Sequence, residues 1–151
     1  MDREALSKAR AEVIEKSINL EWIINAIISQ HYFKRVYLAF VLDFLYDEYC
    51  SFALKRRLIE KIVKDIDSNQ IQNLNRLNTI RNIFAHCGQE IFEGSAIPSK
   101  DQIGKVPHPR KTNEALDFKG LHQEFLEKES KVVKYLFGIY ENLGGLFQKG
   151  E

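Results

Sequence analysis

The chain has 151 residues, of which 44% are hydrophobic, and a net charge of +1. This length is enough for one domain with a substantial hydrophobic core. The near-neutral charge excludes a protein-wide field that attracts DNA or a membrane surface, so any nucleic-acid contact must come from a local basic patch. Two cysteines, Cys50 and Cys87, are too few for a disulfide scaffold or a zinc site. We predict that both thiols are reduced and structural.

The N-terminus is charged and alternates polar with apolar residues, which is not the pattern of a signal peptide. No apolar run approaches the roughly 20 residues that span a bilayer. Neither a glycine-rich phosphate loop nor an HExxH or similar metal-ligand spacing occurs. We therefore expect a cytoplasmic protein that has no membrane contact, no metal and no cofactor.

Two helices are predicted in the first third of the chain. Residues 2–30 have the apolar spacing of a long helix. Its apolar line consists of Leu6, Val13, Leu20, Ile24 and Ile27. From residue 18 to residue 28 this helix is apolar on most sides, so more than one partner should bury it, inside the fold or at a subunit contact. Residues 33–48 are predicted as a second helix, rich in aromatic side chains, with the corner between the two helices at residues 31–32.

A third helix is predicted from an N-cap at Ser51 through Asp65, with an apolar inner face and a basic outer face. The basic residues are Lys55, Arg56, Arg57, Lys61 and Lys64. Such a face is either an ordinary solvated surface or a track that follows a phosphate backbone without reading its sequence. Because periodicity does not choose between them, Lys55, Arg56 and Arg57 are candidate RNA-binding residues.

The stretch with the most information is residues 69–88, which we predict as one helix. Asp67 or Ser68 supplies its N-cap, and Gly88 stands where a left-handed C′ residue ends a helix. At roughly 100° per residue, one side of this helix carries four apolar residues that should face the core. They are Leu74, Leu77, Ile80 and Phe84.

A different side of the same helix is polar. Asn75, Asn78, Asn82 and His86 fall within about 80° of one another on it. Arg81 lies at the edge of the apolar stripe, where its guanidinium must find an anion or an acceptor. Simpler interpretations stay open: a solvated asparagine face, a histidine that only favours the helix dipole, and an arginine whose stem covers the core.

The hexapeptide RNIFAH, from Arg81 to His86, resembles the signature of the HEPN superfamily. That signature is an arginine, a polar residue directly after it, and a histidine after four to six intervening positions, near the end of a helix. Here the interval is four residues and the polar residue is Asn82. Residues 51–59 also resemble the helix that precedes the motif in many such sequences. The similarity is strongest over residues 51–88 and is limited to helix order elsewhere.

The resemblance implies a chemistry and a partner. Superfamily members include endoribonucleases that cleave RNA without a metal ion and work as homodimers. Carried over to this chain, His86 is the general acid or base, Arg81 binds and stabilises the scissile phosphate, and Asn82 orients one or the other. Helix geometry agrees, because positions five residues apart lie ~140° around a helix and cannot both point at one small target. Two copies related by a two-fold axis would supply two histidines and two arginines to one cleft.

After the motif helix the character of the sequence changes. Residues 89–117 hold all three prolines and lack a helical period, which predicts a long insertion loop with room for a short hairpin at residues 90–92. A basic cluster in this segment either grips a phosphate backbone or belongs to an ordinary mobile loop. From this cluster we take Lys105, Arg110 and Lys111 as candidate RNA contacts.

Residues 118–147 are predicted as the last helix, with His122 on its surface. The expected fold is therefore all-α: a single HEPN-like helical domain over residues 1–151, built as a bundle of about five helices with a long loop before the last one.

Three functions are consistent with this sequence. The first is a metal-independent endoribonuclease, a toxin or defence effector, that acts on RNA as a homodimer and has an antitoxin as a possible partner. The second is a non-enzymatic HEPN-like regulatory or protein-binding module, of the mannitol operon repressor type or the partner of a nucleotidyltransferase. The third is a structural dimerisation domain in which the asparagine stripe and Arg81 form a polar seam between helices.

Overall fold

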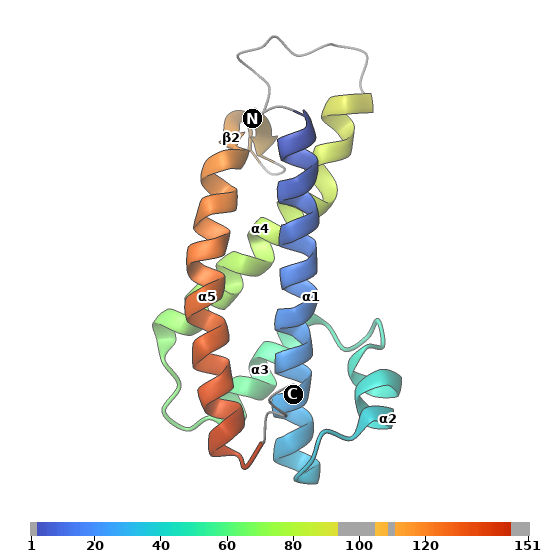
Figure 1. Ribbon diagram of the computed structural model, residues 1–151, viewed down its shortest axis with the longest axis vertical. Helices are drawn as coiled ribbons and strands as arrows, with labels where there is room; N and C mark the ends of the chain where they lie inside the picture. The colour runs from blue at the N-terminus through green and yellow to red at the C-terminus, as the bar shows by residue number, and fades with distance from the viewer. Residues whose placement is uncertain (1–2, 94–104, 109–110, 146–151) are drawn as a thin grey trace, which may run out of the picture. The chain divides into compact units, whose positions relative to one another are not determined.

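A computed structural model describes residues 3–93, 105–108 and 111–145, and the side chains of residues 4–86 and 117–145 (Figure 1). The elements, in chain order, are α1 (Arg3–Phe33), α2 (Leu38–Phe40), the π-helical turn η1 (Val41–Leu45), α3 (Phe52–Ile62), α4 (Ser68–Glu93), β1 (Lys105–His108), β2 (Lys111–Asp117) and α5 (Phe118–Asn142). The predicted all-α bundle is confirmed, with one small β-hairpin added to it.

The chain divides into two compact units. The first unit consists of Met1–Ile18 and Asn73–Ser130, and the second of Asn19–Gln72 and Lys131–Glu151. The helices α1, α4 and α5 each contribute residues to both units. Each unit buries its own set of apolar side chains.

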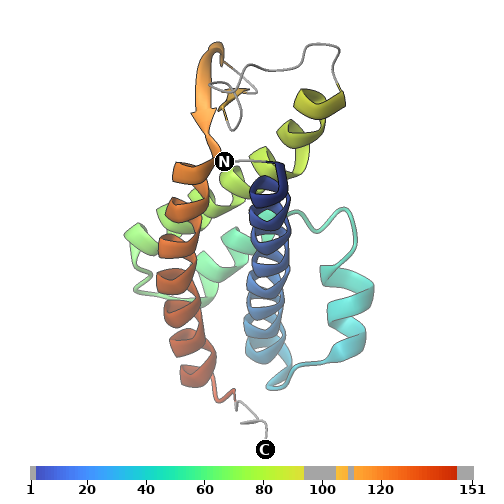
Figure 2. The ribbon, with the colours of Figure 1, turned by 45° about the horizontal axis from the view of Figure 1, so that its top comes forward.

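In the first unit, α1 and α5 run side by side in the same direction (Figures 1 and 2). Two polar contacts set this register. Glu12 Oε2 lies 2.9 Å from His122 Nε2. One turn further along α1 and two turns further along α5, Lys16 Nζ donates to Glu129 Oε2 over 3.3 Å. Because both partners advance together along the chain, the two segments are parallel.

The first unit's part of α4 runs antiparallel to α5. Arg76 donates two hydrogen bonds to the carboxylate of Glu124, each of 2.8 Å, and Lys128 Nζ donates to Asn73 Oδ1 over 3.0 Å. Apolar residues from the three helices fill the space between them. The buried residues of this core are Leu6, Ala9, Val13, Leu74, Leu77, Ile80, Ile83, Phe84, Phe118, Leu121 and Phe125. All four core residues predicted on α4 are therefore confirmed.

The second unit contains a sharp corner at the end of α1, and here the prediction needs correction. The corner is at Lys34, not at residues 31–32, because Lys34 adopts the left-handed conformation (φ 58°) and donates its N–H to the Gln30 carbonyl. The buried Ser29 hydroxyl then fixes the chain beyond the corner. It accepts from the Tyr37 N–H (2.7 Å) and donates to the Arg35 carbonyl (2.9 Å).

The predicted helix over residues 33–48 is also shorter than expected. After Phe33, which ends α1, only residues 38–45 of this range are helical, as the one turn of α2 followed by the π-helical turn η1. The Tyr46 N–H bonds to the Val41 carbonyl, which is the i to i+5 pattern of a π-helix. The aromatic side chains that suggested a longer helix are mostly exposed instead of packed.

Two predicted N-caps are confirmed, while the helix ends differ. The Ser51 hydroxyl accepts from the Leu54 N–H and starts α3, which ends at Ile62 rather than at residue 65. The Asp67 carboxylate accepts from the Asn69 N–H and starts α4. Gly88 does not end α4, because a glycine inside a helix costs only about 1 kcal/mol and the residues after it continue the helix to Glu93.

Within residues 89–117, which were predicted as a long loop, the described residues belong to α4, β1 and β2. Residues 90–92 belong to α4, so no hairpin forms there. A hairpin forms further on, where β1 pairs antiparallel with β2 and Val106 stands opposite Leu116. Arg110 lies outside the described residues. Along the described helices, none has the length and apolar character needed to cross a membrane.

The last helix, α5, ends at Asn142 rather than at residue 147. Gly144 follows in the left-handed conformation (φ +85°), which favours glycine. Gly145 lies under the ring of Tyr140, so close that a Cβ on it would stand 2.3 Å from a ring carbon. Gly138, in contrast, is inside the helix, and a Cβ there would meet no atom within 4 Å.

We therefore predict that replacing Gly138 and Gly145 by alanine changes the stability of the fold in opposite directions. Gly138→Ala should raise the free energy of unfolding by about 1 kcal/mol, since alanine favours a helix and has room. Gly145→Ala should lower it by about 1–3 kcal/mol, since the new methyl group displaces a buried ring. Urea unfolding followed by circular dichroism measures both. Equal effects of the two substitutions would contradict the described end of α5.

Candidate functional site

The motif residues Arg81, Asn82 and His86 lie on the part of α4 that belongs to the first unit. All three side chains are exposed. Arg81 Nη1 donates to Asn82 Oδ1 over 2.9 Å. Arg81 was predicted at the edge of the apolar stripe, where its guanidinium must find an anion or an acceptor. Its side chain is exposed instead, and the acceptor that it finds is the Asn82 oxygen.

Buried residues beneath the motif hold it in place. Ile80, Ile83 and Phe84 are 3% exposed or less. The Phe84 ring packs edge-on against Phe118, with 5.1 Å between ring centroids, and lies 6.5 Å from the ring of His122. Because these side chains fix the rotation of α4 about its axis, they also fix the outward direction of the residues between them.

Arg10 is a residue near the motif that sequence reasoning missed. From α1, its Nη2 donates to the Ala85 carbonyl over 3.0 Å. The bond joins α1 to the turn of α4 that carries His86 and brings a second guanidinium to it. The sequence did indicate that Arg10 lies close to the core, because Arg10 is four residues after Leu6 and three before Val13. That spacing places it beside the buried face of α1.

His122 was predicted as a surface residue, and this is a correction. Its side chain is 21% exposed and pairs with Glu12. The pair joins α1 and α5, and the His122 ring lies 6.5 Å from the Phe84 ring, so His122 is half-buried at the edge of the first unit's core. Phe84 and His86 are two positions apart, about 200° around the helix, so the His122 contact is on a different side of α4 from His86.

The asparagine stripe of α4, which consists of Asn75, Asn78 and Asn82, is at least partly exposed to solvent. Asn75 and Asn78 are half-buried and Asn82 is exposed. The Asn82 oxygen is engaged by Arg81. The stripe therefore fits the solvated-face interpretation within one chain, while its use as a seam between two chains stays a prediction.

The prediction that Lys55 belongs to an exposed basic face of α3 is wrong. In the second unit its side chain is 1% exposed, its Nζ lies 2.5 Å from Glu21 Oε1, and it stands 5.1 Å from the centre of the Tyr46 ring. The reason is visible in the spacing, because Lys55 is three residues after Phe52 and four before Ile59 and so shares their side of the helix.

The other predicted RNA contacts belong to α3 and to the segment of the β-hairpin. Arg57 is exposed and Arg56 is half-buried on α3. Lys105 is in β1 and Lys111 in β2, and their side chains, like the whole of Arg110, lie outside the described part. Arg57 is therefore the member of the predicted set whose side chain is described as exposed.

Cys50 is buried in the second unit. Burial raises the pKa of its thiol, and the nearby Lys55 opposes that rise only in part. A thiol with a raised pKa forms little thiolate at neutral pH, which fits a structural cysteine. Burial likewise raises the pKa of Tyr46, with a further contribution from the Glu21 carboxylate.

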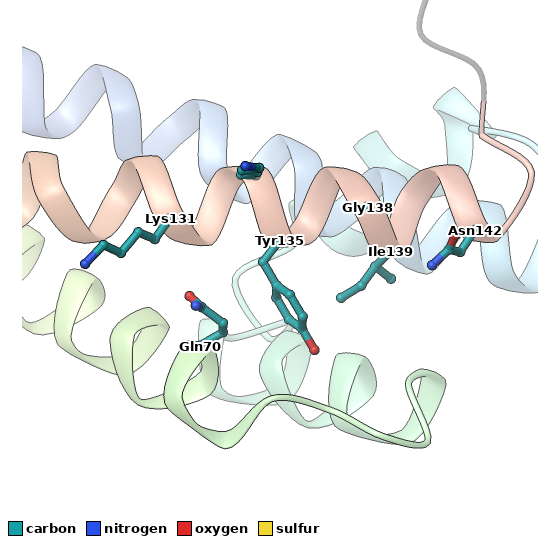
Figure 3. A pocket seen from close by; sticks show the side chains of 7 residues that line it. Gln70, Lys131, Tyr135, Gly138, Ile139 and Asn142 are labelled. Carbon is teal, nitrogen blue, oxygen red and sulfur yellow. The ribbon is translucent and has the colours of Figure 1, made fainter.

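The second unit also has an open pocket of about 500 Å³ (Figure 3). Gln70 from α4 faces Lys131, Tyr135 and Ile139 of α5 across it, and Gly138 leaves its floor free of side chain. The Tyr135 hydroxyl is engaged, since it accepts from the Asp67 N–H over 2.9 Å. The lining holds cations and amides but no carboxylate, histidine or thiol, so it has no acid–base pair.

No three His, Cys, Asp or Glu side chains of the described residues gather closely enough to hold a metal ion. Comparison of the chain with protein-family models, with curated proteins and with solved structures gave no match. The resemblance to the HEPN superfamily therefore depends on the motif residues themselves and stays a prediction.

The placement of Lys55 predicts a contrast with Arg57. Lys55→Glu should lower the free energy of unfolding by about 3 kcal/mol or more, because it puts a second carboxylate against Glu21 in a buried place. Arg57→Glu, on the exposed side of the same helix, should change it by less than about 0.5 kcal/mol. Urea unfolding of both variants is the measurement. Two equally small changes would show that Lys55 is a surface residue.

The Arg76–Glu124 pair predicts a pH dependence. The hydrogen bonds from Arg76 hold the pKa of Glu124 below its ordinary value of 4.5. The pair therefore stabilises the fold above pH 4.5, and its contribution is lost as the pH falls through the lowered pKa. Glu124→Gln should cost about 1 kcal/mol at pH 7, a modest amount because both side chains are partly solvated.

Urea unfolding of wild type and Glu124→Gln at pH 7, 5 and 3 tests this. The difference between the two proteins should shrink between pH 5 and pH 3. Glu15→Gln, at an exposed position on α1, is the control and should match wild type throughout. A difference that stays constant with pH would mean that the carboxylate of Glu124 has no special partner.

Proposed function

We propose that this protein is a metal-independent endoribonuclease of the HEPN type that acts as a homodimer. The observation that carries the proposal is the exposure of all three motif side chains on a helix whose other side is firmly buried. Within the described residues, His86 has no hydrogen bond or ion pair, and Arg81 bonds only to its neighbour Asn82. Side chains kept for packing would be buried, whereas these are free to meet a ligand.

RNA cleavage of this kind needs three groups. A base takes the proton of the 2′-hydroxyl, whose oxygen attacks phosphorus while the bond to the 5′-oxygen breaks. An acid gives that leaving oxygen a proton, and a cation stabilises the charge on the phosphorane. The products are a 2′,3′-cyclic phosphate and a 5′-hydroxyl. Imidazole serves as acid and base near neutral pH, and guanidinium is a permanent planar donor suited to phosphate.

Each copy would supply half of this set. His86 of one copy takes the 2′-hydroxyl proton and His86 of the second copy protonates the 5′-oxygen. Arg81 of either copy binds the non-bridging oxygens. The Asn82 oxygen, which already accepts from Arg81 Nη1, holds the guanidinium in its direction. Arg10, bonded to the Ala85 carbonyl, adds positive charge beside the same turn.

The proposed RNA contacts are narrower than the sequence suggested. Lys55 is withdrawn, because it is buried and paired with Glu21. Arg56 and Arg57, with Lys105, Arg110 and Lys111, remain in the proposal as contacts to the phosphate backbone. A toxin or defence effector in the cytoplasm, with an antitoxin that blocks the site, is the biological setting that we propose.

A second candidate is a non-enzymatic protein-binding module. Many large apolar side chains of the second unit are exposed, and contiguous apolar surface marks protein interfaces. A regulator or the partner of a nucleotidyltransferase would use such a surface and would have no need of His86.

Incubation of the purified protein with RNA in the presence of EDTA separates the two. Wild type should cleave, and His86→Ala and Arg81→Ala should each lose at least about 100-fold in rate, as for an acid–base group and a transition-state cation. Asn82→Ala should lose less, about 10-fold, since it acts through Arg81.

Arg57→Ala is the matched control for Arg81→Ala, because it removes an exposed arginine outside the motif. It should weaken binding of RNA and keep the cleavage rate at saturating RNA. If wild type is dimeric and folded but does not cleave, or if His86→Ala cleaves as well as wild type, the nuclease proposal is wrong and the binding module is favoured.

A further inference from the structure

The pocket of the second unit has a lining that points to a ligand. Its volume of about 500 Å³ is within the range that small molecules fill. It shares no residue with the motif, which belongs to the first unit. Its walls are Gln70 of α4 and six residues of α5, namely Lys131, Lys134, Tyr135, Gly138, Ile139 and Asn142.

Most of the α5 residues of the lining form a row along one side of the helix. Lys131, Tyr135, Gly138 and Asn142 follow one another at spacings of four, three and four residues. At 1.5 Å per residue this row is roughly 16 Å long. Figure 3 shows Lys131 at one end of the row and Asn142 at the other, with Gln70 facing the row from α4. One end of the pocket is therefore cationic and the other end carries an amide.

The cationic end holds two lysines that the described part of the chain does not neutralise. Within it, neither Lys131 nor Lys134 has a hydrogen bond or an ion pair. Lys128, on the same helix, does have partners: its Nζ donates to Asn73 Oδ1 over 3.0 Å and lies 4.0 Å from a carboxylate oxygen of Glu124. Because the lining contains no carboxylate, an anion in the pocket would meet two ammonium groups and no like charge.

The middle of the pocket is apolar and is held in place by the fold. The ring of Tyr135 forms one wall, and its hydroxyl accepts a hydrogen bond from the Asp67 N–H over 2.9 Å. Ile139, beside it in Figure 3, is 8% exposed. A flat ring would pack on these two side chains at little cost in conformational entropy, because the fold already orders them.

Gly138 leaves space over the helix, and the fold does not require a glycine there. It is inside α5, where glycine lowers helix stability relative to alanine. Its φ is not in the left-handed region, and a Cβ on it would meet no atom within 4 Å. Since neither backbone strain nor crowding excludes a side chain, the open space itself is the feature that calls for an explanation. A ligand that lies over Gly138 supplies one.

The donors of the pocket favour a carboxylate over a phosphate. Phosphate sites are usually built from arginine forks or from free N–H groups at a helix N-terminus. The lining has no arginine, and its α5 residues lie inside the helix, where backbone N–H groups are bonded. The first N–H groups of α4, from Asn69 to Ile71, are bonded to Asp67. Two lysine point charges remain, and these suit a singly charged acid.

We propose that this pocket binds a small aromatic carboxylic acid, a molecule with a flat apolar ring and one carboxylate joined by a short chain. The carboxylate lies between the ammonium groups of Lys131 and Lys134. The ring lies over Gly138, against Tyr135 and Ile139. This site is separate from the proposed nuclease motif and does not depend on it.

Isothermal titration calorimetry of the full chain with 4-phenylbutyrate tests the site, beside the neutral 4-phenylbutanol of similar shape. The acid should bind with a dissociation constant on the order of 0.1–1 mM, as expected for a ligand of this size. The alcohol should bind at least about 10-fold more weakly. Lys131→Glu and Lys134→Glu should each weaken the acid at least about 10-fold and leave the alcohol unchanged, because they reverse a charge that only the acid uses.

Gly138→Leu should weaken both compounds at least about 10-fold, because the leucine side chain takes the place of the ring. Since a Cβ at this position meets no atom, the helix should keep its fold, which circular dichroism checks. Lys119→Glu is the matched control: it reverses an exposed charge on the same helix outside the pocket and should bind both compounds as wild type does.

Three results would overturn the inference: no saturable binding of 4-phenylbutyrate, equal binding of the acid and the alcohol, or wild-type affinity in Gly138→Leu. Tighter binding of 3-phenylpropyl phosphate than of 4-phenylbutyrate would show that the assignment of a carboxylate is wrong. None of these measurements uses RNA, so their outcome is independent of whether cleavage depends on His86.

Discussion

The packing of one side of α4 is the constraint on which the candidate site depends. Leu77, Ile80 and Phe84 are buried against α1 and α5, and the Phe84–Phe118 ring contact anchors them. Once that side of the helix is fixed, its period of 3.6 residues directs Arg81 and His86 to solvent. The direction of the motif is therefore a result of core packing, and the hydrogen bonds from Arg10 and Arg81 refine it locally.

In the second unit the pattern is reversed, because some polar side chains are buried and several large apolar side chains are exposed. Its polar groups Ser29 and Lys55 are buried and support the structure, while large apolar side chains such as Leu42 and Phe44 are exposed. A buried lysine paired with Glu21 stabilises a fold little by itself, since desolvation offsets the attraction, but it holds neighbouring rings in a defined place. Polar residues thus face outward at the motif, where we propose chemistry, and apolar residues face outward on the second unit, where a protein-binding module would use them.

Much of the fold could be predicted from the apolar period and the caps. The core residues of α4 and the caps at Ser51 and Asp67 follow from spacing and from side-chain chemistry. The corner at Lys34 could not be predicted, because left-handed lysine is uncommon and it depends on the Ser29 hydroxyl from one turn earlier. The burial of Lys55 was visible in its spacing from Ile59 but conflicted with the usual exposure of lysine.

The candidate site, like the fold, could be predicted only in part from the sequence. The sequence predicted that Arg81, Asn82 and His86 share a helix. The spacing of Arg10 placed it beside the buried face of α1, but its bond to Ala85, 75 residues away, could be identified only in the folded chain. Whether two copies bring their motifs together is a property of the assembly, which one chain does not contain. A crystal structure of the dimer with a non-cleavable RNA dinucleotide measures this most directly. The account predicts that the scissile phosphate lies within hydrogen-bond reach of His86 from both copies, and a phosphate bound elsewhere, with the two His86 side chains directed apart, would contradict it.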